Sequence, residues 1–400
     1  MKHIKKILAC ALAVALTAPM GAMATNGYFS HGYGVKSKSM GGTGVANPKD
    51  SIAAASNPAG MVHVGNRVDA GLELFNPNRE NTQNGGNAGT TESNSTLFGI
   101  PHFGYNTMLD SSTSFGVSVY ANGGMNTDYP TNNGVFGAAA TSLGVDLAQL
   151  MVAPTWSKKL TNGHSVGASV ILAYQRFKAT GLQNFGVIDP DYDDSTGWGV
   201  RIGWMGKIND RLTLGASYQS KIYMSEFDKY KGLFAEQGDF DIPANATIGL
   251  SYQVDKKTTV DFDIQHIGYG EVRSISNNIN ASVNLGTDDG RGFGWNDQTV
   301  YKLGVEHQYN NQWTVRGGLN YGEAPYDNTQ MDFNILAPAT VEWHLTLGAT
   351  YKLSDKNEVD FGYMHAFSNE IVGQSAGFGL NEIKHEMDQN ALFVNYAWKF

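Results

Sequence analysis

Apolar and polar residues alternate along most of the chain beyond residue 66. Within the last twelve residues, the large apolar side chains share one parity: Leu392, Val394, Tyr396, Trp398 and Phe400. Segments 343–353 and 260–264 alternate in the same way. Successive side chains of a β-strand point to opposite faces, so this pattern predicts strands with one apolar and one polar face. A soluble β-sandwich would also alternate, and the pattern alone does not indicate whether water or lipid surrounds the strands.

The alternating segments number fourteen. An even count lets both chain ends lie on one side of a membrane and lets the sheet close without an unpaired edge, which lipid requires. We therefore predict an all-β chain that forms an antiparallel β-barrel of about 14 strands. The strands are expected at 67–75, 95–106, 113–121, 147–157, 164–176, 196–206, 212–223, 243–254, 259–270, 298–309, 313–322, 341–353, 358–367 and 389–400.

Three features indicate that the barrel spans a membrane. Short polar turns, such as those at 209–210 and 310–311, alternate with much longer loops, which is typical of outer-membrane barrels. The chain ends on Phe400 at the outward parity, which resembles the terminal signal that outer-membrane assembly machinery reads. Aromatic residues also gather at the segment ends, as interfacial girdles require: Trp198, Trp204, Tyr218, Tyr252, Tyr301, Tyr309, Trp313, Tyr321, Trp343 and Tyr351.

Composition excludes several classes of protein. Charged residues make up 16% of the chain, against about 25% in a typical soluble domain, and 48 of the 400 residues are glycine. Beyond the first two dozen residues no apolar run approaches the roughly 18 residues of a membrane helix, which excludes a helical membrane protein. The formal net charge of −9 argues against nucleic acid as a partner.

The N-terminal residues have the pattern of a secretory signal peptide. Three lysines within residues 2–6 precede an apolar stretch at 7–19, and Ala-Met-Ala at 22–24 matches a cleavage site. We expect residues 1–24 to be removed and Thr25 to begin the mature chain. A lipoprotein anchor at the single cysteine is the alternative, but the apolar stretch before that cysteine is too short for it.

No motif for cofactor or metal chemistry stands out. The single cysteine, Cys10, lies in the predicted signal peptide, so the exported chain has no disulfide and no thiolate metal site. Neither His-Glu-x-x-His nor Gly-x-Ser-x-Gly occurs. We therefore predict no cofactor, no metal and no enzymatic activity, with a surface Ser–His barrel enzyme as the alternative that spacing leaves open.

Residues 25–66 do not alternate and are rich in Gly, Ala, Ser and Asn. About forty residues without a core of their own form either a disordered tail or a plug inside the barrel. Few charges and many small side chains favour a plug, because small residues let backbone fill a narrow lumen. The predicted domains are therefore a signal peptide at 1–24, an N-terminal hatch at 25–66 and a transmembrane barrel at 67–400.

Four segments resemble the FadL/TodX family of outer-membrane transporters for long-chain fatty acids and other hydrophobic compounds: Ser-Asn-Pro-Ala-Gly at 56–60, the stretch at 116–129, Gln-Trp-Thr-Val-Arg-Gly-Gly at 312–318 and the C-terminal 395–400. The resemblance implies a monomeric, fourteen-stranded barrel in the outer membrane of a Gram-negative bacterium, closed by an N-terminal hatch. It further implies passive uptake of fatty acids or aromatic hydrocarbons.

The resemblance also implies roles for particular residues. In the hatch, Asn57, Pro58 and Ala59, with Gly60 completing the motif, would anchor the segment, and Phe29 would reach the ligand cavity.

In that family the third strand kinks inward and opens a hole in the barrel wall. Asn122, Gly123 and Gly124 interrupt the third strand of this chain at a comparable place. Adjacent glycines weaken a strand and supply no side chain to block a gap, so we expect the lateral opening here. The alternative is that Asn122 and Gly123 simply begin an extracellular loop.

Two sets of cations are candidates for binding a ligand head group. Arg176 and Lys178 resemble a stretch on the family's fifth strand, but the parity of Arg176 points outward, where it would instead meet lipopolysaccharide phosphates. Arg201 and Arg316 have inward parity, and the alternative for each is a salt bridge to a lumenal acid such as Glu306.

The sequence thus predicts a carrier of hydrophobic small molecules that also contacts outer-membrane lipid and lipopolysaccharide. Ligand would bind inside the barrel and leave sideways through the wall. A general or substrate-specific porin is the first alternative and predicts a charged constriction without a plug. An adhesin-type structural barrel is the second, and its function would depend on the outer loops alone.

Overall fold

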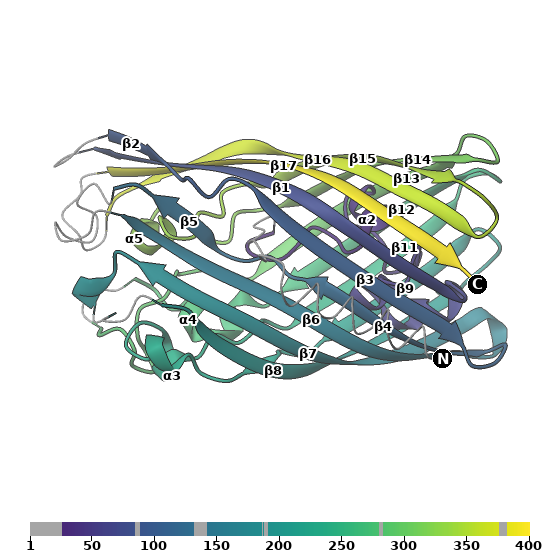
Figure 1. Cartoon of the computed structure of the whole chain (residues 1–400), viewed down its shortest axis with the longest axis horizontal. Coiled ribbons are helices and arrows are strands. Elements are labelled where there is room, and N and C mark those ends of the chain that lie inside the picture. Colours follow the sequence, from purple (N-terminus) through teal and green to yellow (C-terminus); the bar gives the residue numbers. More distant parts are fainter. Residues whose placement is uncertain are drawn as a thin grey trace.

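The described residues form one antiparallel sheet that closes into a barrel (Figure 1). The computed structural model describes residues 26–84, 89–131, 142–185, 187, 191–279, 283–375 and 382–400, so the predicted signal peptide and Thr25 lie outside it. Strand β1 (Arg67–Asn84) pairs with β3 (Phe98–Met108) on one side and with β17 (Glu382–Lys399) on the other, which closes the sheet. Closure leaves no sheet edge, as lipid requires.

Fourteen strand traversals make up the wall in the described part of the chain, which confirms the predicted number. Three traversals are interrupted and comprise β2 with β3, β4 with β5, and β9 with β10. Besides the three strands above, the strands are β2 (Gly89–Glu92), β4 (Thr113–Ala121), β5 (Asn126–Tyr129), β6 (Leu143–Lys159), β7 (His164–Thr180), β8 (Asp193–Lys207), β9 (Leu212–Gln219), β10 (Tyr223–Met224), β11 (Asn245–Gln253), β12 (Thr258–Ile267), β13 (Gln298–Gln308), β14 (Trp313–Gly322), β15 (Trp343–Lys352) and β16 (Asn357–Gly373).

Several strands are longer than the alternation predicts. Strand β1 continues to Asn84 although alternation ends at Phe75, and β17 begins at Glu382 although alternation begins at residue 389. The two extensions pair with each other from Asn76↔Asn390 to Asn84↔Glu382. Both faces of these extensions are largely polar, so the ladder continues where the apolar pattern has already stopped.

The outer face of the barrel is apolar and the inner face is mixed. On β17, Leu392, Val394, Tyr396 and Trp398 are between 44% and 58% exposed, whereas the intervening Ala391, Phe393, Asn395 and Ala397 are buried. The predicted inward and outward parities are therefore confirmed on this strand. Apolar side chains facing outward suit a lipid environment.

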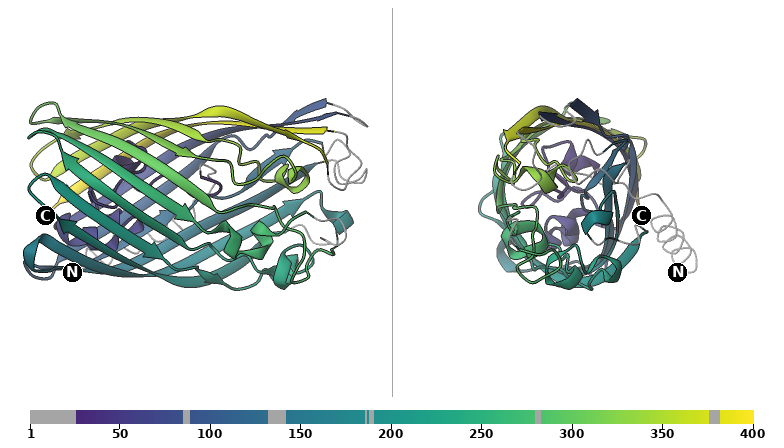
Figure 2. Two further views of the ribbon diagram at one scale, coloured as in Figure 1. Left: turned by 180° about the vertical axis from the view of Figure 1, so that it is seen from behind. Right: turned by 90° about the vertical axis from the view of Figure 1, so that its left-hand side faces the viewer.

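The two ends of the barrel differ (Figures 1 and 2). Short turns such as 208–211 and 353–356 join strands at the end that carries the C-terminus, while connections such as 268–297 and 323–342 fold over the other end. No helix in the described ranges is long and apolar enough to cross a membrane. The short helices are α2 (Val35–Lys38), η1 (Ala53–Ala55), η2 (Pro58–His63), η3 (Thr161–Gly163), η4 (Gln183–Phe185), η5 (Asp228–Tyr230), α3 (Ala235–Gly238), η6 (Tyr269–Glu271), α4 (Arg273–Ser276) and α5 (Met331–Asn334).

Residues 26–66, the lumenal segment, lie inside the barrel, as the view along its axis shows (Figure 2, right). All but four of residues 26–62 are buried. The segment contains α2, η1 and η2 and contacts the inner face of strands around the wall.

Inward-facing glycines make room for this segment. A β-carbon at any of ten wall glycines would collide with an atom of residues 39–61, so backbone and small side chains sit directly against the wall strands. This close approach accounts for part of the high glycine content. The ten are Gly104, Gly116, Gly167, Gly203, Gly215, Gly249, Gly304, Gly318, Gly348 and Gly362.

Replacing one of these glycines should displace the segment. A β-carbon at Gly203 would overlap the Asn57 side chain, so Gly203→Ala is expected to cost about 1–3 kcal/mol of overpacking and to loosen the lumenal segment. The measurement is single-channel conductance in planar bilayers, which should rise above that of the unmodified protein. Gly317→Ala is the control, because its β-carbon would meet nothing nearer than Leu347 Cδ2 at 3.6 Å. Equal conductance of the two variants would contradict this account.

Candidate functional site

The Asn-Pro-Ala-Gly turn is tied to both the lumenal segment and the wall. Asn57 Nδ2 donates to the carbonyl oxygen of Val45 at 2.7 Å and to that of Trp204 at 3.0 Å. Its Oδ1 accepts from the Ala59 amide at 3.0 Å and so caps η2, where Pro58 occupies the first turn. Proline suits this position because its fixed φ is helical and it lacks the amide that would otherwise be unsatisfied. One side chain thus joins three parts of the chain.

Buried ion pairs hold the same segment further along. Lys38 pairs with Glu73 of β1, and Lys36 pairs with Glu358 of β16. All four side chains are at most 8% exposed. Breaking a buried ion pair costs roughly 3–5 kcal/mol because one charge stays buried alone. These pairs therefore resist displacement of the segment.

An aromatic cluster joins the beginning of the segment to the long connections. The Tyr28 ring lies 5.4 Å from that of Tyr269 and 5.9 Å from that of Trp295. Phe29 packs edge-on against Tyr269 at 5.9 Å, and Tyr269 Oη donates to the Asn26 carbonyl at 2.5 Å. Phe29 therefore lies in this cluster, where the beginning of the lumenal segment contacts the connection 268–297.

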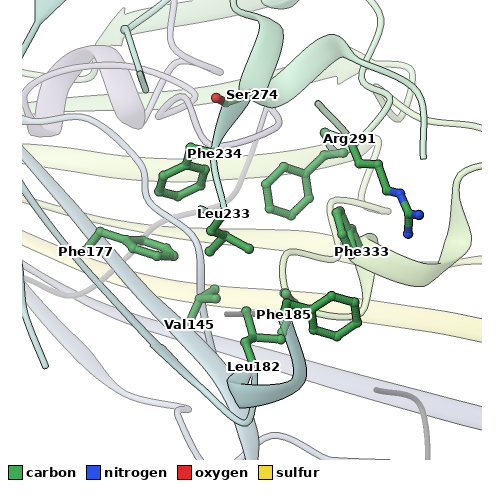
Figure 3. A pocket seen from close by; sticks show the side chains of 12 residues that line it. Val145, Phe177, Leu182, Phe185, Leu233, Phe234, Ser274, Arg291 and Phe333 are labelled. Atoms are coloured by element: carbon green, nitrogen blue, oxygen red, sulfur yellow. The ribbon is translucent and has the colours of Figure 1, made fainter. Parts of the chain in front are cut away.

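An apolar cavity lies beside the aromatic cluster, among the long connections, and Figure 3 shows the side chains that line it. It is built from two strands and several connections, so no single element forms it. Its polar residues are Ser274, whose hydroxyl donates to the Asp239 carbonyl at 2.5 Å, and Arg291, whose Nε donates to the Val283 carbonyl at 2.9 Å. The lining residues are Val145, Phe177, Leu182, Phe185, Leu233, Phe234, Ser274, Arg291, Gly292, Phe293, Phe333 and Leu336.

These properties are those of a small-molecule site. Ligand pockets are mostly apolar and contain few polar groups, and this lining has the same composition. The Ser274 hydroxyl and the Arg291 Nε each already donate to a protein carbonyl, and the other lining side chains are apolar. The cavity therefore suits an apolar molecule or the apolar part of a larger one.

The barrel wall is interrupted at the third traversal. The ladder between β3 and β4 ends at Phe103↔Val119, and residues 98–102 of β3 have ladder partners in the described chain only on β1. Strand β4 stops at Ala121, where it pairs with Leu150 of β6, and the traversal resumes as β5, which pairs with β6 after a register shift of one residue. Because the traversal continues beyond residues 122–125, these residues interrupt a strand.

The predicted opening residues lie at this interruption. Asn122 is 2% exposed and accepts a hydrogen bond from Tyr33 Oη of the lumenal segment at 2.9 Å. Gly124 lines a second cavity, of about 210 Å³, together with Met125, Asn126, Arg79, Trp295 and residues 337–339. The place predicted for a lateral opening thus combines a broken ladder, a glycine and a cavity.

The four predicted head-group cations occupy three different environments. Arg316 donates to Glu306 at 2.7 Å and to Thr350 at 2.6 Å, which is the salt-bridge alternative. Arg201 is buried and donates to Gln219 at 2.5 Å, and no described carboxylate lies within 4 Å of it. Arg176 and Lys178 are on the outer parity of β7, at 4.7 and 5.4 Å from the Tyr192 ring.

The cavity-lining residues were not predicted from the sequence. Alternation could have indicated that Phe177 faces the lumen, because it shares the inward parity of β7 with Ala173 and Ala179. Leu233, Phe293 and their neighbours lie in long connections, where no period relates a residue to a face. Within the described ranges no three His, Cys, Asp or Glu side chains are grouped so that they could hold a metal ion.

One acidic pair in the connection 225–244 should respond to pH. Burial and the negative charge of Asp241 raise the pKa of Asp239 to about 7, and Lys221 pairs with Asp241 at 2.8 Å. In the unfolded chain Asp239 titrates near 4. Stability from this group therefore falls as pH rises from about 4 to about 7, and is constant above that range.

Hydrogen exchange at pH 5 and pH 8, corrected for the intrinsic rate, measures this effect. The amides of residues 230–242 should open more easily at pH 8, and Asp239→Asn should remove the difference. Asp228→Asn is the control, since Asp228 is exposed and pairs only with the nearby Lys231 among the described residues. A pH difference that survives in Asp239→Asn would assign the effect to another group.

The sequence and the architecture are both similar to those of known outer-membrane proteins. A family model described as "Outer membrane protein transport protein (OMPP1/FadL/TodX)" matches residues 11–395. The crystal structure of the toluene transporter TodX of Pseudomonas putida is similar with a TM-score of 0.72 and 20% identity, covering 92% of this chain and 99% of that one. At this identity the likeness concerns the fold.

Two outer-membrane proteins are similar in sequence. Outer membrane protein P1 of Haemophilus influenzae is 21% identical over 343 residues, which are 74% of this chain and 70% of that protein. An outer membrane protein of Neisseria meningitidis is 22% identical over 228 residues, half of this chain, and the match spans about half (48%) of its length. The family match over nearly the whole chain, together with the closed fourteen-stranded barrel, shows that the chain belongs to the OMPP1/FadL/TodX family of outer membrane transport proteins.

Proposed function

We propose that this protein carries small hydrophobic compounds passively across the outer membrane, with long-chain fatty acids and aromatic hydrocarbons as the two candidate classes. The ligand binds in the apolar cavity and leaves sideways through the interruption at residues 122–124. The observation that carries this proposal is the apolar cavity at the long-loop end, which is lined largely by aromatic and aliphatic side chains.

The cavity supplies the driving force for binding. Burying apolar ligand surface contributes about 25 cal/mol per Å², and aromatic rings provide much of the contact area here. The structurally similar TodX is a toluene transporter, which agrees with an apolar ligand.

Residues 25–66 act in this proposal as the hatch, with Asn57, Pro58, Ala59 and Gly60 as its anchor. Their hydrogen bonds, the ion pairs of Lys36 and Lys38, and the close glycine contacts support a segment that stays in place. A general porin fits less well, because its water-filled lumen would need this segment to be absent. Since the hatch obstructs the axial path, a bound ligand needs another exit.

Lateral release into the membrane costs less free energy than release into the periplasm. A hydrophobic molecule released into the periplasm would lose its apolar contacts to water, whereas one released into the membrane keeps them. The second cavity beside Gly124 supports a route from the lumen to this part of the wall. The two cavities are lined by residues that are close in sequence. Phe293 and Leu336 line the first cavity, and Trp295 and Ala337 line the second.

Filling the cavity tests the binding step. Val145 is 3% exposed and lines the cavity, so Val145→Trp should occupy its space and reduce the uptake of toluene and of a fatty acid at least tenfold. Uptake of radiolabelled ligand by cells carrying the variant is the measurement, with heat-modifiable gel mobility as the check on folding. Val170→Trp is the matched control, because Val170 lies on the outer face of β7 and is 47% exposed. Normal uptake by folded Val145→Trp would place the binding site elsewhere.

Blocking the interruption tests the exit step. Gly124→Trp should stop uptake while ligand binding to the purified protein stays near normal, because the bulky ring closes the wall without entering the apolar cavity. Gly317→Trp, on the outward parity of β14, is the control and should transport normally. Should folded Gly124→Trp transport at the normal rate, the ligand leaves by another route, such as past the hatch.

A further inference from the structure

The short turns at the end that carries the C-terminus continue the apolar outer face of the barrel. In the described part of the chain, six such turns join consecutive strands, and each begins with a large apolar residue on the outward parity of the strand before it. Hydrocarbon therefore extends to the first residue of each turn, and the remaining turn residues lie at the level of the lipid head groups. The six residues and their exposed fractions are Leu109 62%, Leu160 46%, Ile208 51%, Val254 45%, Tyr309 67% and Leu353 54%.

Three of these turns are neighbours and carry basic side chains. Turns 160–163, 208–211 and 254–257 join β6 to β7, β8 to β9 and β11 to β12, and these strands follow one another around the wall. The Gln253 amide donates to the Arg211 carbonyl at 2.8 Å, which ties the last two turns together. The exposed basic residues in and beside the three turns are Lys158, Lys159, Lys207, Arg211, Lys256 and Lys257.

The two acids of these turns are already engaged. Asp210 pairs with Lys207 at 3.2 Å. Asp255 accepts from the amides of Lys257 at 2.7 Å and Thr258 at 2.9 Å and so caps its own turn.

The other five cations form no ion pair with any described residue, and together they are called the basic sector: Lys158, Lys159, Arg211, Lys256 and Lys257. The formal net charge of the chain is −9, so the basic sector is a local reversal of sign. Such a surface is complementary to an anionic partner.

Aromatic side chains fix the height of the basic sector relative to the membrane. Trp156 is 44% exposed on the outward face of β6, and Lys158 follows two residues later on the same face. Tyr252 is 41% exposed and lies on the outward parity of β11, two residues before the turn 254–257. Aromatic rings of this kind lie at the boundary between hydrocarbon and head groups, and a lysine just beyond them extends its ammonium group into the head-group layer.

We propose that the basic sector binds the phosphate groups of anionic phospholipids in the leaflet at the short-turn end of the barrel. In outer-membrane barrels the short turns face the periplasm, so this is the inner leaflet. Guanidinium and ammonium groups donate charge-assisted hydrogen bonds to phosphate oxygens. Phosphatidylglycerol carries a net negative charge, whereas the ammonium group of phosphatidylethanolamine is repelled by the basic sector. The sector therefore selects phosphatidylglycerol, whatever ligand the barrel carries inside.

Removing three of the five charges tests the inference. Fluorescence anisotropy of labelled phosphatidylglycerol, with the full protein in a neutral detergent, measures binding, and unlabelled phosphatidylethanolamine is the competitor of neutral charge. Each base near an anionic surface raises affinity about fivefold, so the triple variant Arg211→Gln, Lys256→Gln, Lys257→Gln should bind phosphatidylglycerol at least about tenfold more weakly. High salt should weaken binding to the unmodified protein in the same direction, because it screens exposed charges.

A matched control removes the same charge from the other end of the barrel. Lys229, Lys231 and Arg273 have side chains that are 35%, 56% and 48% exposed in the long connections. Their triple replacement by glutamine should leave binding of phosphatidylglycerol unchanged. Lys158→Gln with Lys159→Gln is a second variant, in the neighbouring turn, and should weaken binding by a smaller factor than the triple variant does. Heat-modifiable gel mobility checks that every variant is folded.

Three results would overturn the inference. One is equal competition by phosphatidylethanolamine and phosphatidylglycerol for the unmodified protein. Another is an equal loss of phosphatidylglycerol binding in the control variant, which would reflect the net charge of the protein and not the basic sector. The third is undiminished binding by the folded triple variant, which would leave the basic sector to a soluble acidic partner.

Discussion

The close approach of residues 39–61 to wall glycines is the contact on which the rest of the structure depends. A barrel of fourteen traversals encloses more space than its own side chains fill, and here backbone occupies it. That arrangement works only where the wall presents hydrogen in place of a β-carbon, because protein interiors tolerate little overlap. The polar groups of the inserted backbone then need partners, and Asn57, Asp263 and Thr346 provide them from the segment itself and from the wall.

The lumenal segment also contributes to the region of the apolar cavity. Tyr28 and Phe29 pack in one apolar cluster with residues of the connections 225–244, 268–297 and 323–342. Aromatic rings from strands and connections meet there and line the apolar cavity. The interruption of the third traversal lies beside this region, and Tyr33 bonds Asn122 across it. The lumenal segment is therefore in direct contact with the interruption of the wall.

Much of this fold was predictable from the sequence and much of the site was not. Alternation identifies a strand only while lipid lies on one side. For this reason the traversals were predicted, but the predicted end of β1 at Phe75 is nine residues short of Asn84, where the strand ends. The same limit hid Arg79, which lies on the extension of β1. The Asn-Pro-Ala-Gly turn and the Gly-Gly interruption were found because their residue types have local conformational meaning. Leu233 and Phe293 carry no such information, since only the packing of connections brings them together.

The composition of the apolar cavity bears on both affinity and selectivity. Apolar surface that is buried against such a lining contributes free energy in proportion to its area, so rings and chains of similar area are equivalent there. A charged group differs, because it must lose its water, and that loss is offset only where hydrogen-bond donors are already fixed. Ten of the twelve lining residues have no polar side chain, so the lining compensates the loss of water poorly and favours neutral, apolar surface.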